Sequence, residues 1–162
     1  MAQADFFLKI DGIQGESKDH THPNEIQLIS VTMGVSNTGK GGYGSGSGTG
    51  KADVQDITVS KYVDKSTPNL YKYCFQGKTV GDAKITMRKS GGDSPVEYLV
   101  LTLTEVFVSS VSTSGHDGAE LATESVALNF AKVEITYTIQ DELGSSGAST
   151  PITIDVKANR VT

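Results

Sequence analysis

The sequence VEYLVLTLTEVFVSSV, residues 96–111, is the longest apolar run of the chain and decides its fold. β-Branched and aromatic residues dominate it, which is typical of a β-strand. Alternate leucines from Leu99 to Leu103 share one face by the two-residue period of a strand, whereas the valines from Val106 onward have the opposite parity. The period slips near Glu105, so we expect a bulge or bend there. A strand of this length that bends can serve two sheets, as in a small barrel.

The composition fits a single all-β domain over residues 1–162. This length is enough for one domain with a hydrophobic core. The 18 glycines exceed the usual share of glycine, roughly 7% of residues, by about half. The formal net charge of −5 argues against a nucleic-acid partner, because that affinity depends largely on Lys and Arg. A single cysteine, Cys74, excludes an intramolecular disulfide.

The first residues do not have the pattern of a targeting signal. Residues 1–7 lack both the basic and the apolar part of a secretory signal peptide. The sequence also has no run of about eighteen apolar residues, the length that a membrane-spanning helix needs. We therefore expect a chain that starts in the cytoplasm, has no cleaved signal peptide and does not insert into a membrane.

Strand patterns flank the central run on both sides. Residues 4–10 alternate as a strand, and residues 25–35 and 125–139 each change phase, so we expect two further bent strands. Residues 144–149 read as a flexible connector. About seven strands predict a small β-barrel of two sheets with one short helix packed on its side. The remaining strand segments are residues 54–63, 83–89 and 152–156.

One segment carries helix signals. The helix is expected to begin at Ser66–Thr67–Pro68, where a hydroxyl N-cap precedes a proline that fits the first helical position, and Gly77 is a typical C-terminal glycine. Four apolar residues form one stripe that we expect to pack on the barrel: Leu70, Tyr71, Cys74 and Phe75.

The glycine-rich segment of residues 39–50 matches two phosphate-binding patterns only formally. Seven of its twelve residues are Gly, which predicts a flexible loop. Gly39 to Gly44 fit G-x-G-x-x-G, and Gly34 to Lys40 fit G-x-x-x-x-G-K. A phosphate loop must lead into a helix N-terminus, whereas this loop leads into a strand. We therefore predict no nucleotide cofactor.

Three other groups could carry chemistry, and each has a simpler interpretation. Asp19, His20 and His22 could bind a metal, but two imidazoles without a further ligand favour a solvated loop. Cys74 has apolar and aromatic neighbours and is expected to be an inert thiol. Glu105 has no second carboxylate on its face, which favours a salt bridge at a subunit contact or barrel end over a catalytic carboxylate. We predict no enzyme activity, no metal and no cofactor.

Several motifs along the chain are also those of a known family. They are GESKD at 15–19 with His22, Glu25 and Ile26, VQD at 54–56, KYVDKSTPNL at 61–70, RK at 88–89, VEY at 96–98 and SSVS at 109–112. These motifs resemble the Hcp proteins, the haemolysin-coregulated tube subunits of type VI secretion. The resemblance covers nearly everything from Phe6 to Tyr137 and is least at residues 140–162. It implies a β-barrel with one helix, related to phage tail tubes, in homohexameric rings that stack into a tube.

The resemblance also implies partners. These are further copies of the chain, a spike protein at the tube tip, a contractile sheath outside and small effector proteins in the lumen. Export would follow contraction, and the roughly twenty residues after Gln140 are too few for a fused toxin domain. A monomeric ligand-binding β-barrel module stays an alternative, and a hydrolase that uses Glu105 or the histidine pair is a third.

Two regions are candidate functional sites on this resemblance. The inner wall of a ring is a sheet, and Ser30 and Thr32 are the polar set opposite Val31, so we expect both to face the lumen and contact effectors. The loop after this strand is expected at a ring face. Its candidate stacking residues are Gly39, Lys40, Gly41, Gly42, Tyr43, Gly44 and Lys51.

Overall fold

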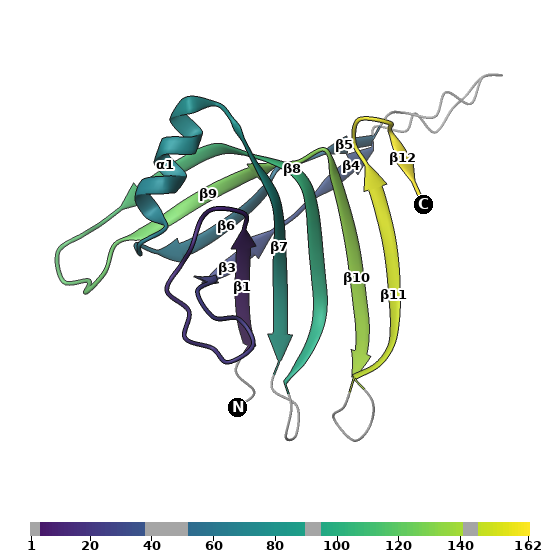
Figure 1. Ribbon diagram of the computed structural model, residues 1–162, viewed down its shortest axis with the longest axis horizontal. Coiled ribbons are helices and arrows are strands. Elements are labelled where there is room, and N and C mark those ends of the chain that lie inside the picture. The colour runs from purple at the N-terminus through teal and green to yellow at the C-terminus, as the bar shows by residue number, and fades with distance from the viewer. Residues whose placement is uncertain (1–3, 38–51, 90–94, 141–145) are drawn as a thin grey trace.

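The computed structural model describes residues 4–37, 52–89, 95–140 and 146–162. The described residues form twelve strands and one helix, in a ten-stranded and a two-stranded sheet (Figure 1). The predicted all-β class with one short helix is confirmed. The elements are β1 (Ala4–Ile10), β2 (Ile26–Leu28), β3 (Ser30–Thr32), β4 (Val35–Asn37), β5 (Ala52–Val54), β6 (Ile57–Tyr62), α1 (Thr67–Gln76), β7 (Thr79–Lys89), β8 (Val96–Ser114), β9 (Thr123–Asn129), β10 (Lys132–Gln140), β11 (Ser146–Asp155) and β12 (Arg160–Val161).

The bend predicted in the central strand lies at Glu105. β8 pairs with β10 up to Thr104 and with β9 from Phe107 onward, while β7 pairs with both halves. Glu105 lies between them with a φ of 53°, a left-handed conformation found at bulges. In Figure 1, β8 runs alongside β7 and β10 and then turns toward β9. The bend is confirmed, but the two halves of β8 serve two parts of one ten-stranded sheet and not two separate sheets.

The segment predicted as one bent strand over residues 25–35 consists of three short strands. β2 pairs with β1, β3 with β6 and β4 with β5. The partner changes at Ile29, where the apolar alternation changes phase. The strand order β8–β7–β1–β2 ends at β2, and after Ile29 the strand β3 pairs with β6, β6 with β9 and β9 with β8. The most deeply buried apolar side chains are Leu8, Ile26, Ile57, Val59, Leu70, Ile85, Leu101, Leu103, Val106, Val108, Val126, Leu128 and Val133.

The C-terminal part of the chain differs from its prediction. The segment of residues 125–139, predicted as one long bent strand, consists of two strands, β9 and β10, with a break at residues 130–131. Residues 146–149, predicted as a connector, instead belong to β11 and pair with β10. Their side chains are exposed, so no apolar alternation marks this part of the strand.

The helix α1 lies near its predicted position, but its first turn is built differently. Gly77 has a left-handed φ of 65° and donates its amide to carbonyls of the last turn, which confirms the C-terminal glycine. The N-cap residue is a hydroxyl residue as predicted, Ser66, but its side chain makes no capping hydrogen bond. The Ser66 hydroxyl donates to the Asp64 carboxylate, and the Thr67 hydroxyl accepts a hydrogen bond from the Asp64 amide. No helix in the described ranges is long and apolar enough to cross a membrane.

The predicted apolar stripe of α1 faces the core only in part. Leu70 is fully buried and Cys74 packs against the core, but Tyr71 is 42% and Phe75 94% exposed. Tyr73 contacts the core in their place. Residues 70, 73 and 74 form an i, i+3, i+4 stripe, so the helix is rotated relative to the prediction.

A buried ion pair fastens the start of α1 to the sheet. Lys61 of β6 and Glu124 of β9 are buried, and Lys61 Nζ lies 2.5 Å from Glu124 Oε2. Thr67 donates its hydroxyl to the same oxygen at 2.9 Å, and Asp64 lies 3.1 Å from Lys61 Nζ. The alternation of the sequence places Lys61 on the core face, and the structure agrees. No sequence pattern predicted that Glu124 is buried.

Candidate functional surfaces

The two residues predicted to face a lumen lie on an exposed face of small hydroxyl side chains. Ser30 and Thr32 of β3 are both exposed, while Val31 between them packs against the core. Ser30 lies opposite Ser60, and the two hydroxyls are 2.5 Å apart. Cross-strand pairs continue this face over β6, β9 and β8. We call it the hydroxyl face; its residues are Ser30, Thr32, Thr58, Ser60, Ser110, Ser112 and Ser125.

The predicted ring-stacking residues lie outside the described residues. This holds for Gly39, Lys40, Gly41, Gly42, Tyr43, Gly44 and Lys51. The formal phosphate-binding patterns overlap the same segment and are likewise outside it.

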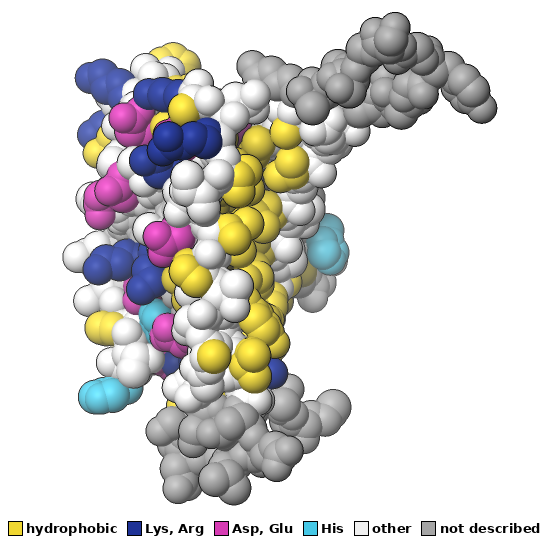
Figure 2. All heavy atoms as spheres, turned by 90° about the vertical axis from the view of Figure 1, so that its right-hand side faces the viewer, with side chains coloured by type: hydrophobic (Ala, Val, Ile, Leu, Met, Phe, Trp, Pro, Cys, Tyr) yellow, Lys and Arg dark blue, Asp and Glu magenta, His cyan; other side chains and the backbone are white. Residues whose placement is uncertain are grey.

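Exposed apolar side chains form a strip along β10 and β11 (Figure 2). On β10, Tyr137 is 46% and Ile139 49% exposed; on β11, Ile152 is 41% exposed. Ile152 lies opposite Ile135, which lies opposite the buried Leu101 of β8. The strip is therefore the outward continuation of the core face of the sheet. We call it the apolar strip; its residues are Tyr137, Ile139, Ile152 and, on β12, Val161.

The apolar strip lies beside an open strand edge. β11 pairs with β10 on one side, and β12 pairs with β11 only at Ile154 and Asp155. Within the described part of the chain, no strand pairs with the outer edge of residues 146–152. An apolar surface next to unpaired strand groups is typical of a protein–protein contact.

Residues 13–25 form a strap that covers β1 and β7 on the side away from the core. Backbone hydrogen bonds close it on itself: Gly15 donates its amide to the Asn24 carbonyl at 2.8 Å, and Ser17 donates to Glu25 at 3.0 Å. A Cβ on Gly15 would lie 2.5 Å from the Glu25 carbonyl oxygen, so the close approach requires glycine. The strap corrects the expectation that residues 83–89 have one wet face, because it buries Phe7, Thr86 and Arg88 there.

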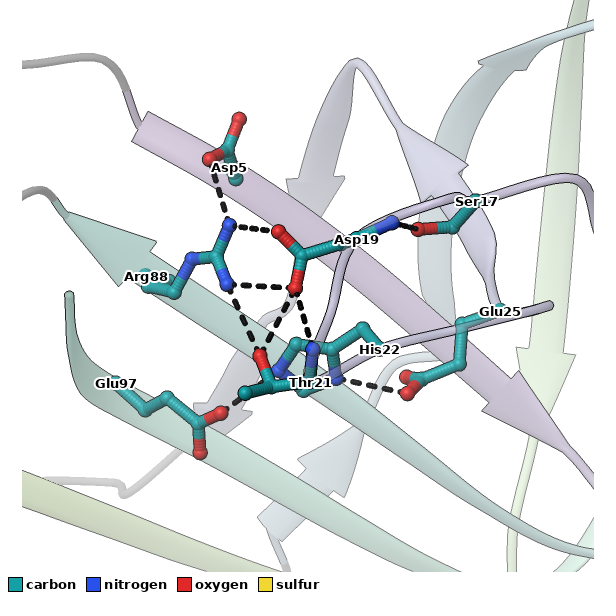
Figure 3. Close-up of polar contacts among 8 residues, drawn as sticks. All are labelled: Asp5, Ser17, Asp19, Thr21, His22, Glu25, Arg88 and Glu97. Atoms are coloured by element: carbon teal, nitrogen blue, oxygen red, sulfur yellow. Dashed lines mark hydrogen bonds and ion pairs between the residues drawn. The ribbon is translucent and has the colours of Figure 1, made fainter. Parts of the chain in front are cut away.

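Arg88 holds the strap by a two-pronged contact with Asp19 (Figure 3). Its Nη1 and Nη2 atoms donate to Asp19 Oδ1 and Oδ2 at 2.9 and 2.6 Å, and Nη2 also donates to Asp5 at 3.0 Å. The guanidinium holds the pKa of Asp19 well below its ordinary value. The hydrogen bond to Asp19 in turn raises the pKa of Arg88.

His22 lies at the other attachment of the strap (Figure 3). Its Nδ1 is 2.8 Å from Glu25 Oε2 and its Nε2 is 2.7 Å from Glu97 Oε1. The ring stacks on Phe7 with centroids 4.5 Å apart. His22 is only 6% exposed, so the expectation of a solvated histidine was wrong for this residue.

The other candidate residues do not converge on one site. His20 is exposed while His22 is buried, and the described ranges hold no group of three side chains suited to a metal. Cys74 is half-buried. Glu105 forms the expected type of contact, a salt bridge, but within its own chain: Lys157 Nζ lies 2.5 Å from its carboxylate.

A polar hollow of about 710 Å³ lies where the strap meets the ends of the long strands. Asp19, Arg88 and Glu97 line one side, and hydroxyl residues of β10 and β11 line the other. Sequence reasoning missed this region because its charged residues are far apart in the chain. The RK at 88–89 and the VEY at 96–98 were the signals that could have pointed to it.

Comparisons with known proteins agree on one family. Residues 7–137 match the family model described as "Type VI secretion system effector, Hcp". Protein hcp1 of Pseudomonas aeruginosa is 50% identical over 141 residues, which cover 87% of this chain and 87% of that protein.

Solved structures give the same result. Hcp1 from Salmonella typhimurium is 39% identical, with a TM-score of 0.81 over 100% of both chains. A structure of "a type six secretion system protein" is 25% identical, with a TM-score of 0.92 over 99% of this chain and 100% of that one.

Proposed function

Because the chain belongs to the Hcp family of type VI secretion proteins, we propose that it is a structural subunit of the secretion tube. In this proposal, six copies form a ring and the rings stack end to end. The observation that carries it is the apolar strip beside the open edge of β11. The strip leaves a core-like surface exposed in the single chain, and a second copy would cover it.

The difference between the two sides of the subunit supports a ring. The apolar strip lies at the β11 end of the ten-stranded sheet, while β2 ends the same strand order on the opposite side. A contact between two unlike surfaces is heterologous, and such contacts close into rings or continue as filaments. The number six and the stacking of rings through residues 39–51 come from the family resemblance.

The hydroxyl face is the surface that we assign to the lumen. Small, uncharged hydroxyl groups form hydrogen bonds through water and offer little apolar area, so a cargo protein can be held weakly and released. Small effectors would contact Ser30 and Thr32 there. The sheath, the spike and export from the cytoplasm without a cleaved signal peptide belong to the same proposal.

A substitution on the apolar strip tests assembly. Ile152→Lys places a charge in the proposed contact and should convert the ring to smaller species, because a buried unpaired charge is costly. Thr153→Lys is the matched control: it lies on the opposite face of β11, across from Glu134, and should keep the ring. Native mass spectrometry measures both, with circular dichroism to check the fold.

The wild type should have six times the 17.1 kDa mass of one chain. A wild type that stays a monomer at micromolar concentration would contradict the proposal and favour the ligand-binding module. If the Ile152→Lys variant formed a ring as stable as that of the wild type, the apolar strip would not be part of the contact between subunits.

A further inference from the structure

We propose that His22 is a proton-dependent clasp, which fastens the strap of residues 13–25 to β8 while its ring is charged and releases it when the ring loses a proton. The clasp lies within one chain, so the inference does not depend on ring assembly.

With both glutamates ionised, the two contacts of His22 require a proton on each ring nitrogen. Nδ1 lies 2.8 Å from a Glu25 oxygen and Nε2 lies 2.7 Å from a Glu97 oxygen. A neutral imidazole has one N–H and one lone pair, and an ionised carboxylate only accepts hydrogen bonds. Two short contacts to two carboxylates are therefore satisfied together only by the imidazolium, which donates to both.

The two glutamates belong to different parts of the fold. Glu25 is three residues from His22 and is part of the strap, whereas Glu97 is on β8. The contact with Glu97 is thus the one that ties the strap to β8. After loss of a proton, the remaining N–H can serve Glu25 within the strap, and the Nε2 lone pair then faces the Glu97 carboxylate.

The ion pair of Arg88 and Asp19, which also holds the strap, keeps its charges over the neutral range. Arg88 of β7 lies over the Phe7 ring, with its Cζ 4.9 Å from the centroid, and is paired with Asp19 of the strap and Asp5 of β1. Their pairing lowers the pKa of Asp19 and raises that of Arg88, which moves both away from neutrality. Histidine is the side chain that changes charge in the neutral range. Raising the pH should therefore release the His22 attachment while Arg88 still holds the strap.

The release would change the polar hollow. Glu97, from which the strap would be released, and Arg88, which would still hold it, both line the hollow. The hollow would open at alkaline pH and close around the strap at acid pH.

Hydrogen exchange and histidine NMR test the clasp in the full-length protein. In the wild type, ring ¹⁵N shifts of His22, recorded over a pH series from about 5.5 to about 8.5, should report an imidazolium while the strap is attached and a neutral ring once it is released. The strap amides of Gly15, Ser17 and Asn24 should lose protection by about tenfold over this range, after correction for the intrinsic pH dependence of exchange. That is the size expected for one charge-assisted hydrogen bond.

Glu97→Gln is the decisive variant. A glutamine amide can accept from an N–H or donate to a lone pair, so it satisfies His22 in either charge state. The strap of this variant should stay protected at both ends of the pH range. His20→Gln, which removes an exposed histidine of the same strap, should behave as the wild type.

Three results would each overturn the proposal. The first is a His22 ring that is neutral at acid pH in the wild type. The second is strap protection that does not change with pH while the ring titrates. The third is Glu97→Gln with the same pH dependence as the wild type. His22→Gln, which has no titrating ring, gives a second check, because its strap protection should be independent of pH.

Discussion

At the scale of single residues, Arg88 and Asp19 show how charge can hold a polar loop against a sheet. Asp19 presents both carboxylate oxygens to the guanidinium, and only a quarter of its side chain is exposed. This two-pronged geometry is the strong form of an ion pair. The strap therefore depends on the ionised state of one aspartate.

The first prediction concerns acid stability. The folded-state pKa of Asp19 is depressed, so its contribution to stability is complete above the ordinary aspartate pKa of about 3.9 and is lost as the pH falls further. Asp19→Asn should lower the free energy of unfolding at neutral pH by on the order of 2 kcal/mol. It should also flatten the decline in stability below pH about 4.

Urea unfolding at several pH values and one protein concentration measures both effects. Asp117→Asn, an exposed aspartate between β8 and β9, is the matched control. If the free energy of unfolding of Asp19→Asn fell with decreasing pH as steeply as that of the wild type, the contact with Arg88 would not be the cause of the acid sensitivity.

Residue patterns in the sequence predicted the core better than the charged network. Alternation placed Leu101, Val106 and Lys61 on the core face, where the structure has them. It could not predict that Arg88 and His22 are buried, because the strap that covers them is polar. Arg88 contacts a residue 69 positions away, and neither partner is part of a local pattern.

At the scale of elements, the rotation of α1 was not decided by its hydrophobic pattern. A ten-residue helix with Leu70, Tyr71, Tyr73, Cys74 and Phe75 offers two overlapping stripes. The contact between Thr67 and Glu124 fixes the first turn and so selects one of them. The same limit applies to the strand break at Ile29, where a phase change predicted a bend but not the change of partner strand.

The second prediction is that the buried Lys61–Glu124 pair anchors α1. Glu124→Ala should cost about 3–5 kcal/mol, because it leaves Lys61 buried and without its nearest carboxylate. Lys61→Met combined with Glu124→Leu should recover most of this loss, since apolar residues of similar volume can replace a buried pair. Chemical denaturation measures the free energy of unfolding of each variant.

The exposed Lys132–Asp155 pair, at 3.9 Å, provides the comparison. Lys132→Ala should change stability by about 1 kcal/mol or less. A double variant no more stable than Glu124→Ala would show that the charges, and not the packing volume, hold the helix.

At the scale of the whole molecule, the single chain leaves its core unfinished. Tyr137, Ile139 and Ile152 follow the strand alternation and would be assigned to the core from sequence, yet each is more than 40% exposed. The sheet extends past the elements that cover it, to the open edge of β11. The local sequence pattern does not indicate what covers this surface. The prediction of assembly therefore rests on the family resemblance and not on the periodicity of the strands.

The last prediction concerns the hydroxyl face and rests on the proposed tube. Thr32 is exposed on β3 and lies opposite Thr58, so a longer side chain there has room to point into solvent. Thr32→Arg should leave the free energy of unfolding within about 0.5 kcal/mol, as exposed substitutions usually do, and should leave the ring mass unchanged. It should lower the amount of a small effector that copurifies with the ring several-fold, because six added charges would crowd the lumen.

Thr32→Ser, which keeps the hydroxyl, is the matched control and should retain the effector. An intact Thr32→Arg ring that holds as much effector as the wild type would place the cargo contact elsewhere. A Thr32→Arg chain that unfolds would contradict the exposed position of Thr32.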